Sequence, residues 1–483
     1  MHRFLISAAH KSSGKTTLSI GLAAALREAG PPSRQGRLSV QPYKKGPDYI
    51  DPLWLGLAAG RPCQNLDFYL SPPAELQAQF ARRGHDADVC IVEGNKGLYD
   101  GLDLDGSNSN AALAHLLDLP VILVLDARGM TRGIAPLILG YQAFDPRIRI
   151  AGVILNKLGG RRHEAKLRAV IEHYTDVPVL GAVQHDERLT LVERHLGLMP
   201  ANETAAAAAK VATIADAVRA QVDLPRLLEL SRTEQPLPTP LPRGACAGER
   251  LRVAVARDPA FGFYYAQDLD ALVDAGAELR FFDTLHCARL PECDALLIGG
   301  GFPESFLPQL EANASLRDEI RQRIAEGLPC YAECGGLMYL ARSIESGGRR
   351  AEMVGAIPGD VRMHSRPVGR GYVVLDPTAE HPWRDAGPGA PPGGQPIASG
   401  PLRAHEFHYS AIEGLPADTR YAYRVRRGHG IDGEHDGIVI GNLLASYTHL
   451  RATAGCDWPA RFVAFARQAR AAATSKETRP CLR

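Results

Sequence analysis

The sequence lacks three features that define other protein classes: long apolar runs, an excess of one charge, and closely paired cysteines. No apolar stretch reaches the roughly 18 residues of a membrane helix, so no membrane span is expected. Residues 1–9 turn polar too early for a secretory signal peptide. A net charge of +1, with 23% charged residues, gives no reason to expect nucleic acid or a membrane surface as a partner.

Nine cysteines are scattered along the chain with no CxxC pair, and their number is odd. Disulfide frameworks and structural zinc sites need paired cysteines, so reduced thiols and a cytoplasmic location are expected instead. The chain also lacks an internal repeat. Its 483 residues are too many for one ordinary domain, and we expect two or three.

The first half of the chain alternates strand-like and helix-like segments. Apolar runs at 3–9, 89–92, 121–125 and 151–155 are typical of buried strands, and most are followed by material suited to a crossover helix. This alternation predicts a mostly parallel sheet covered by helices. A second α/β alternation begins near residue 250.

The domain boundaries follow from composition. Four prolines lie in a short polar stretch within residues 227–249, and this composition predicts an extended linker. A Gly- and Pro-rich segment at 377–401 predicts a surface loop. We therefore predict an α/β fold with domains at 1–226 and 250–471, a linker at 227–249, and a loose tail at 472–483.

The segment after the first strand has the pattern of a phosphate-binding loop. Gly14-Lys15-Thr16 opens a predicted helix, where backbone N–H groups hold phosphate, Lys15 reaches the β/γ-phosphates and Thr16 can ligate Mg²⁺. Ala9 replaces the usual first glycine, and an extra lysine matches the deviant form of the loop. The alternative is a chance Gly-Lys-Thr at a helix start. The predicted ATP-binding residues are Lys11, Ser12, Ser13, Gly14, Lys15, Thr16 and Thr17, with Asn156 as a candidate contact to the base.

Carboxylates are expected near this loop, at the C-terminal edge of the sheet. Asp48 and Asp51 lie three residues apart beside two lysines, and Glu93 directly follows a strand, where ligands bind in open parallel sheets. Hard carboxylate oxygens suit a Mg²⁺ that bridges phosphates, which predicts Thr16, Asp48 and Glu93 as metal ligands. Asp48 and Asp51 could instead only cap and turn the chain.

A long polar loop at 95–110 follows Glu93 at the same edge. We interpret it as a substrate-facing lid, and a solvated loop is the alternative. The residues predicted to face the substrate are Asp51, Asn95, Lys96, Tyr99 and Asp100.

A strand, a cysteine, two glycines and a helix are expected around Cys334. The glycines permit close backbone approach, and a helix N-terminus favours the thiolate, so Cys334 is a candidate nucleophile. His449, after a strand-like segment, could take the thiol proton and later protonate a leaving amine. Gly300 and Gly301 could supply the N–H groups of an oxyanion hole.

Structural explanations stay open for these residues. Cys334 could be an inert buried thiol and His449 a structural histidine. The pair His405 and His408 could serve a metal, a substrate or structure, because an HxxH spacing alone is weak support for zinc.

Jointly the motifs resemble the cobyrinate a,c-diamide synthase family. The match keeps the same order from about residue 3 to residue 470. The motifs that carry it are Lys44-x-Gly-Pro-Asp48-Tyr-Ile-Asp51-Pro, Asn65-Leu-Asp67, Glu93-Gly-x-x-Gly-Leu-Tyr-Asp-Gly, Arg194-His-Leu-Gly-Leu198, Tyr331-Ala-Glu-Cys-Gly-Gly-Leu-Met-Tyr-Leu, His405-Glu-Phe-His-Tyr-Ser and Ala445-Ser-Tyr-Thr-His449.

The resemblance implies an N-terminal ATP-dependent ligase domain, with a P-loop sheet of the dethiobiotin-synthetase type. It also implies a C-terminal class I glutamine amidotransferase domain with a flavodoxin-like fold, in which Cys334 is the nucleophile and His449 its base. ATP and Mg²⁺ are the implied cofactors. L-glutamine and a tetrapyrrole carboxylate are the implied substrates, and a homodimer stays open.

Two departures from the family pattern leave alternatives. Arg451 stands where many class I glutaminases have a glutamate, so the group that orients His449 is not identified. Asn95-Lys96 replaces residues that are often apolar, which resembles siroheme amidases and leaves siroheme or sirohydrochlorin as substrates. A cobyrate synthase, and a P-loop switch ATPase with an inert glutaminase-like domain, are further alternatives.

Overall fold

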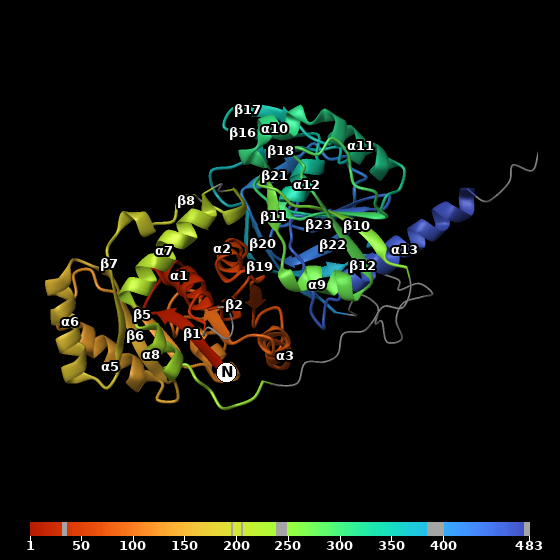
Figure 1. Ribbon diagram of the computed structural model, residues 1–483. Helices are drawn as coiled ribbons and strands as arrows, with labels where there is room; N and C mark the ends of the chain where they lie inside the picture. The colour runs from red at the N-terminus through yellow and green to blue at the C-terminus, as the bar shows by residue number, and fades with distance from the viewer. Residues whose placement is uncertain (31–35, 195–196, 204–205, 238–248, 384–399, 478–483) are drawn as a thin grey trace, which may run out of the picture. The chain divides into compact units, whose positions relative to one another are not determined.

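The computed structural model describes residues 1–30, 36–194, 197–203, 206–237, 249–383 and 400–477 (Figure 1). The chain divides into two compact units, Met1–Leu241 and Pro242–Arg483. The division falls inside the predicted linker, of which residues 238–248 lie outside the described part.

The first unit is built on a seven-stranded sheet with the order β3-β2-β4-β1-β5-β6-β7, in which every pairing is parallel. Its strands are almost entirely buried, as expected of a parallel sheet that is covered on both faces. They are β1 (His2–Ala8), β2 (Val40–Lys45), β3 (Gln64–Leu66), β4 (Val89–Glu93), β5 (Val121–Asp126), β6 (Ile150–Leu158) and β7 (Val179–Gln184).

Helices cover both faces of this sheet (Figure 1). One core is formed with α1 (Lys15–Arg27), α2 (Ile50–Ala59), α7 (Ala207–Gln221) and α8 (Leu224–Leu230). The other is formed with α3 (Pro73–Gly84), α4 (Asn110–Leu117), α5 (Ile134–Phe144) and α6 (Arg161–Tyr174). The short elements are η2 (Glu187–Leu189), β8 (Glu193–Arg194), β9 (Gly197–Leu198) and η3 (Ala201–Glu203).

Helix α8 changes the predicted linker, because residues 227–230 are helical rather than extended. The Asp223 side chain accepts a hydrogen bond from the Arg226 N–H at the helix start, and Leu224 and Leu227 are buried in the core of the first unit. A capped helix with an apolar face therefore extends into the segment that was predicted to be an extended linker.

The second unit contains a nine-stranded mixed sheet with the order β12-β10-β13-β15-β24-β23-β22-β19-β20. The strands from β12 to β24 pair in parallel, and the rest pair antiparallel. They are β10 (Leu251–Ala256), β12 (Ala277–Phe282), β13 (Ala295–Ile298), β15 (Cys330–Glu333), β19 (Gly369–Pro377), β20 (Leu402–His408), β22 (Arg420–Arg427), β23 (His435–Ile440) and β24 (Leu443–Ser446).

Smaller sheets and helices complete this unit. The strands of the small sheets are β11 (Phe261–Phe263) with β14 (Gly300–Gly301), and β16 (Ser343–Ser346), β17 (Arg349–Glu352), β18 (Asp360–Met363) and β21 (Ser410–Glu413). The helices are α9 (Ala266–Asp274), η4 (Pro303–Ser305), α10 (Leu307–Ala312), α11 (Ala314–Ala325), α12 (Gly335–Leu340) and α13 (Trp458–Glu477). Helix α13 reaches into the predicted tail, of which residues 472–477 are helical.

The predicted α/β class, with a parallel sheet in the first unit, is confirmed. Within the described residues, no helix is both long enough and apolar enough to cross a membrane. The cysteines of the described part, Cys63, Cys90, Cys287, Cys293, Cys330, Cys334 and Cys456, are all free thiols. Most of the predicted loop at 377–401 lies outside the described residues.

Candidate active sites

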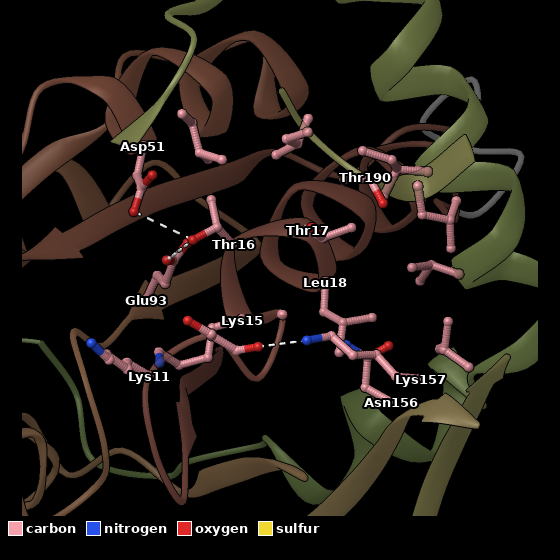
Figure 2. Close-up of a pocket in the computed structure, with 18 of the residues that line it drawn as sticks. Lys11, Lys15, Thr16, Thr17, Leu18, Asp51, Glu93, Asn156, Lys157 and Thr190 are labelled. Atoms are coloured by element: carbon pink, nitrogen blue, oxygen red, sulfur yellow. Dashed lines mark hydrogen bonds between the residues drawn. The ribbon is translucent and has the colours of Figure 1, made fainter. Parts of the chain in front are cut away.

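The predicted phosphate loop joins the end of β1 to the start of α1. Gly14 is the residue before α1 and has a φ of 88°, in the left-handed region that glycine tolerates. A Cβ atom at Gly14 would stand 2.1 Å from Asn156 Nδ2, which donates to the Ser13 carbonyl at 2.8 Å. Lys157 Nζ donates to the Ser12 carbonyl at 2.6 Å. The end of β6 therefore fixes the loop (Figure 2).

Lys15 lies buried at the start of α1. Burial lowers its pKa to about 8, repulsion from Lys44 acts in the same direction, and attraction by Glu93 opposes both. A buried ammonium with incomplete compensation favours an anion beside it. Its position at a helix start with glycine before it suits a phosphate group.

Thr16 and Lys44 meet two of the predicted carboxylates, and Figure 2 shows Thr16 beside Asp51 and Glu93. The Thr16 hydroxyl donates to Glu93 Oε1 at 2.7 Å and to Asp51 Oδ2 at 3.3 Å. The Lys44 ammonium lies 2.7 Å from Glu93 Oε1 and 2.5 Å from Asp51 Oδ2. Burial lowers the pKa of Lys44, but Asp51, Glu93 and Asp48 outweigh it and raise that pKa well above its usual value.

Asp48 has two roles in the structure. Its Oδ1 accepts the N–H groups of Ile50 at 2.9 Å and Asp51 at 3.1 Å, so it caps the start of α2 as the structural alternative proposed. Its Oδ2 lies 3.9 Å from Lys44 Nζ. Burial and the neighbouring Asp51 raise the pKa of Asp48.

The carboxylates beside the phosphate loop offer oxygen ligands for Mg²⁺. Glu93 is fully buried, its Oε2 has no hydrogen-bond partner among the described residues, and burial raises its pKa. Such an orphaned oxygen suits a cation. Among the described residues, no three His, Cys, Asp or Glu side chains form a metal site by themselves. Mg²⁺ is usually bound by one or two carboxylates together with substrate phosphates, so the residues fit a metal that arrives with a nucleotide.

A cavity of about 630 Å³ opens beside the phosphate loop. One wall contains the apolar residues Val183, Leu189, Leu191, Leu198, Ile214 and Val218, together with the polar residues Gln184, His185, Asp186 and Thr190. This wall offers a face on which a nucleobase can pack. The predicted site residues that line the cavity are Lys11, Ser12, Gly14, Lys15, Thr16, Thr17, Asp48, Asp51, Glu93, Asn95, Lys96 and Asn156.

The loop after Glu93 is held by the Asn110 side chain. Asn110 Oδ1 accepts the Asn95 N–H at 3.2 Å, and its Nδ2 donates to the Gly97 carbonyl at 2.7 Å. Lys96 has a φ of 43° and its side chain is exposed. Lys45, which is 7% exposed, donates to Asn95 Oδ1 at 3.3 Å.

Two of the residues predicted to face the substrate do not line the cavity in the described part of the chain. Tyr99 donates its hydroxyl to the Tyr141 carbonyl at 2.6 Å, and its ring packs on Phe144, with 4.7 Å between the ring centroids. Asp100 accepts the Gly97 N–H at 2.9 Å and closes a turn within the loop. Both side chains therefore hold the loop together.

Cys334 lies between β15 and α12 with a φ of 49°, and its N–H donates to the Ser446 carbonyl at 2.7 Å. A Cβ atom at Gly336 would stand 2.1 Å from the Ile298 carbonyl oxygen. Gly336, the second glycine after the thiol, is therefore needed for close packing on β13. A Cβ at Gly300 would stand 2.7 Å from His449 Cε1, so β14 lies directly against the imidazole.

His449 contacts both Cys334 and a residue that the sequence did not indicate, Glu333. His449 Nδ1 lies 3.3 Å from Glu333 Oε2, and burial lowers its pKa while hydrogen bonds to Cys334 and Glu333 raise it to about 10. The signal available in the sequence was a carboxylate at the end of a buried strand, which is costly unless it is paired.

Arg451 and the predicted HxxH pair pack around this site. Arg451 is 1% exposed, and its guanidinium lies 4.9 Å from the ring centroid of Tyr265. The His405 ring stacks on His449 with centroids 5.0 Å apart, and the His408 ring stacks on Tyr447 at 3.9 Å. Both histidines therefore pack against other residues of the site.

Comparisons with known proteins agree with this division. A CobB/CobQ-like glutamine amidotransferase domain matches residues 252–455, and an AAA domain matches residues 74–192. A cobyrinate a,c-diamide synthase from Magnetococcus marinus is 44% identical, over 94% of this chain and 95% of its own. A protein of the same name from Methanosarcina acetivorans is 40% identical, over 94% of this chain and 93% of its own.

A solved structure, PurLQS from Thermotoga maritima, is also similar, with a TM-score of 0.34 and 17% identity. The match covers 45% of this chain and 99% of the PurLQS chain.

Proposed function

The chain belongs to the cobyrinate a,c-diamide synthase family, and from this premise we propose that it is a glutamine-hydrolysing, ATP-dependent ligase that amidates peripheral acetate carboxylates of a tetrapyrrole of the cobyrinate type. The observation that supports this most is that one chain holds two separate sites. One has a thiol beside an imidazole, and the other has a phosphate loop beside carboxylates.

The second unit releases ammonia from L-glutamine. Cys334 gives its proton to His449, the thiolate sulfur attacks the carboxamide carbon, and the same proton then leaves with the nitrogen as ammonia. Water hydrolyses the thioester, which yields glutamate and restores the thiol. The N–H groups of Gly300 and Gly301 are proposed to stabilise the oxyanion.

The first unit activates the acceptor. An oxygen of the substrate carboxylate displaces ADP from the γ-phosphorus of ATP, and the carbonyl carbon of the acyl phosphate then takes ammonia and releases phosphate. Lys15 and the backbone of the phosphate loop hold the phosphate groups. Thr16 and Glu93, with Asp48 or Asp51, would hold Mg²⁺, which neutralises phosphate charge when it is bound.

The loop at 95–110 is proposed to meet the substrate through Lys96, with the buried Lys45 behind it. Burial lowers the pKa of Lys45 to about 8, attraction by Asp67 opposes this, and repulsion from Lys96 and Lys44 acts in the same direction as burial. An approaching carboxylate relieves this repulsion. The same cations support a second candidate, in which the same reaction takes siroheme or sirohydrochlorin. Incubation of the protein with each macrocycle, followed by mass spectrometry of the amides, distinguishes the substrates.

The variant Cys334→Ser tests the two-site proposal. Glutamine-driven amidation is expected to disappear, while ammonium-driven amidation persists at the wild-type rate because the first unit is unchanged. Equal loss of both activities contradicts it. ATP-dependent self-association without glutamine hydrolysis would favour a switch ATPase instead. A cytoplasmic location and a homodimer stay predictions.

A further inference from the structure

Glu333 is the last residue of β15 and precedes the thiol directly. Its Oε1 accepts the Leu450 N–H at 3.0 Å and the Tyr331 hydroxyl at 2.5 Å, and its Oε2 faces His449 Nδ1 at 3.3 Å. The side chain of Glu333 is 9% exposed and that of His449 is 4% exposed. Each carboxylate oxygen therefore has a defined partner, and one of them is the imidazole.

The contact fixes the tautomer of His449. A carboxylate only accepts hydrogen bonds, so Nδ1 must carry a proton, and the other ring nitrogen is left for the Cys334 thiol. The ring is also held on its face by His405, and the two backbones pair, with the His449 N–H donating to the His405 carbonyl at 2.8 Å. Cys334, Glu333 and His405 are titratable groups that act on the ring, and the Arg451 cation acts on His405 behind it.

The strand register explains why this glutamate reaches the histidine. β15 and β24 are parallel neighbours, and Glu333 pairs with Ser446, the last residue of β24. Asp436 of β23 accepts the N–H groups of Tyr447 and Thr448, both at 3.0 Å, and so fixes the turn that leads to His449. The residue before the thiol and the residue after this turn therefore meet at the same edge of the sheet.

Arg451 is a cation and cannot supply this carboxylate, and Asp268, another buried carboxylate of this unit, has other partners. Asp268 Oδ1 accepts the Ala452 N–H at 2.8 Å, and its Oδ2 accepts the Trp458 Nε1–H at 3.3 Å. The carboxylate of Glu333, by contrast, contacts the His449 imidazole.

We propose that Glu333 is the positioning residue of the glutaminase site, and that it supplies from the strand before the nucleophile the carboxylate that other class I glutaminases place two residues after the histidine. This inference rests on the proposed function. When Cys334 gives its proton to His449, the imidazole becomes a cation, and the ionised Glu333 offsets that charge without taking a proton itself.

The variant Glu333→Gln tests this role. The glutamine oxygen can still accept from Leu450 and Tyr331, but its amide then faces Nδ1 as a donor and forces the ring into the wrong tautomer. We expect kcat for glutamine hydrolysis to fall by about 10²- to 10⁴-fold with little change in KM. Ammonium-driven amidation should stay at the wild-type rate.

The pH profile separates positioning from a structural role. Glu333 stabilises the protonated imidazole, so Glu333→Gln should move the alkaline limb of kcat/KM for glutamine to lower pH. Asp268→Asn is the matched control, since it neutralises a buried carboxylate of the same unit that does not touch His449. It should lower thermal stability and leave the limb in place.

An activity of Glu333→Gln within about threefold of wild type, with an unmoved alkaline limb, overturns the proposal. If Glu333→Gln does not fold, Glu333→Asp decides, because the shorter carboxylate cannot keep both the Leu450 and the His449 contacts. A large fall in kcat supports the role, and wild-type kcat overturns it.

A failure of the proposed function would be visible separately. If the wild-type protein released no glutamate, the rate at which iodoacetamide alkylates Cys334 would still report on the contact. Glu333→Gln should lower that rate about tenfold at neutral pH, and an unchanged rate overturns the proposal.

Discussion

Single residues in both sites have backbone conformations that most side chains avoid. Ser12, Lys96 and Cys334 have φ values of 62°, 43° and 49°. Each such conformation costs on the order of 1–3 kcal/mol and persists only where the surroundings fix it. Lys157 fixes the loop that contains Ser12, and Asn110 fixes the loop that contains Lys96. The Ser446 carbonyl fixes the backbone of Cys334. These three residues therefore lie where ligands are expected, whereas Asp118, with a φ of 50°, ends helix α4.

Gly14→Ala is expected to abolish ATP binding. The left-handed φ of 88° costs an alanine about 1–2 kcal/mol, and its Cβ would overlap Asn156 Nδ2. Equilibrium titration with a fluorescent ATP analogue measures the loss. Gly140→Ala is the control, since a Cβ there meets nothing within 4 Å in helix α5, and it should bind like wild type. Wild-type affinity of Gly14→Ala would contradict the assigned loop.

Lys44→Met is expected to destabilise the first unit by about 3–5 kcal/mol, because it leaves Glu93 and Asp51 without their buried cation. Mg²⁺ should then raise the melting temperature of the variant more than that of wild type. Thermal denaturation with and without the ion measures both effects. Lys166→Met, at an exposed position on α6, should change neither. An unaltered melting temperature of Lys44→Met would be incompatible with this account.

At the scale of elements, local sequence patterns predicted the parallel strands well. β4 and β5 begin at the first residues of the predicted runs at 89–92 and 121–125, since buried strands are short apolar runs with polar flanks. The patterns did not indicate α8, because the prolines predicted an extended segment, and they did not indicate that α13 continues to Glu477. The antiparallel strands of the second sheet were not predicted either. In β22, for example, exposed arginines interrupt the run of apolar residues.

The segment after β19 gives a prediction about acid stability. His381 Nδ1 accepts the Trp383 N–H at 3.1 Å, its Nε2 lies 2.9 Å from the Tyr423 hydroxyl, and burial lowers its pKa to about 3. The unfolded chain binds a proton near pH 6.5 and the folded chain does not, so stability falls as the pH drops below that value.

Urea titrations at pH 7.5 and 5.5 check this. His381 should contribute a loss of about 1.4 kcal/mol for each pH unit below 6.5. His381→Gln should reduce the loss by that amount, whereas His173→Gln, at an exposed position, should not. The same pH dependence in wild type and His381→Gln would show that this histidine is protonated in the folded state.

The loop at 95–110 gives a second prediction at this scale. Lys96→Met should raise KM for the tetrapyrrole about tenfold, equivalent to about 1.4 kcal/mol, because one cation beside Lys45 is lost. KM for ATP should change little. Asp105→Asn, at an exposed position of the same loop, is the control. Steady-state kinetics with ammonium as the nitrogen donor measures these constants, and an unaltered KM for the tetrapyrrole would remove Lys96 from the substrate site.

At the scale of the whole molecule, each site is built from residues of one unit. The contacts of Gly14 come from the first unit, and those of Cys334 and His449 come from the second. Sites that share no partners usually behave additively. The sequence order of the motifs already predicted this separation.

The double variant Gly14→Ala/Cys334→Ser tests the independence of the sites. The free energies of unfolding of the two single variants should add to within about 0.5 kcal/mol in the double variant. Cys334→Ser alone should bind the ATP analogue like wild type, and Gly14→Ala alone should keep wild-type alkylation of Cys334. A coupling well above that limit would show that the two sites share a structural element.

The sequence by itself determined the chemistry that this chain can carry: a phosphate loop, carboxylates at strand ends, a thiol before two glycines, and a later histidine. Local spacing encodes these motifs because each of them consists of a few neighbouring residues in one segment of backbone. Only the tertiary structure decided how the motifs are completed. Lys44 reaches Glu93 across neighbouring strands, and Glu333 reaches His449 because β15 and β24 are adjacent. Such partners depend on strand order and register, which no local pattern records.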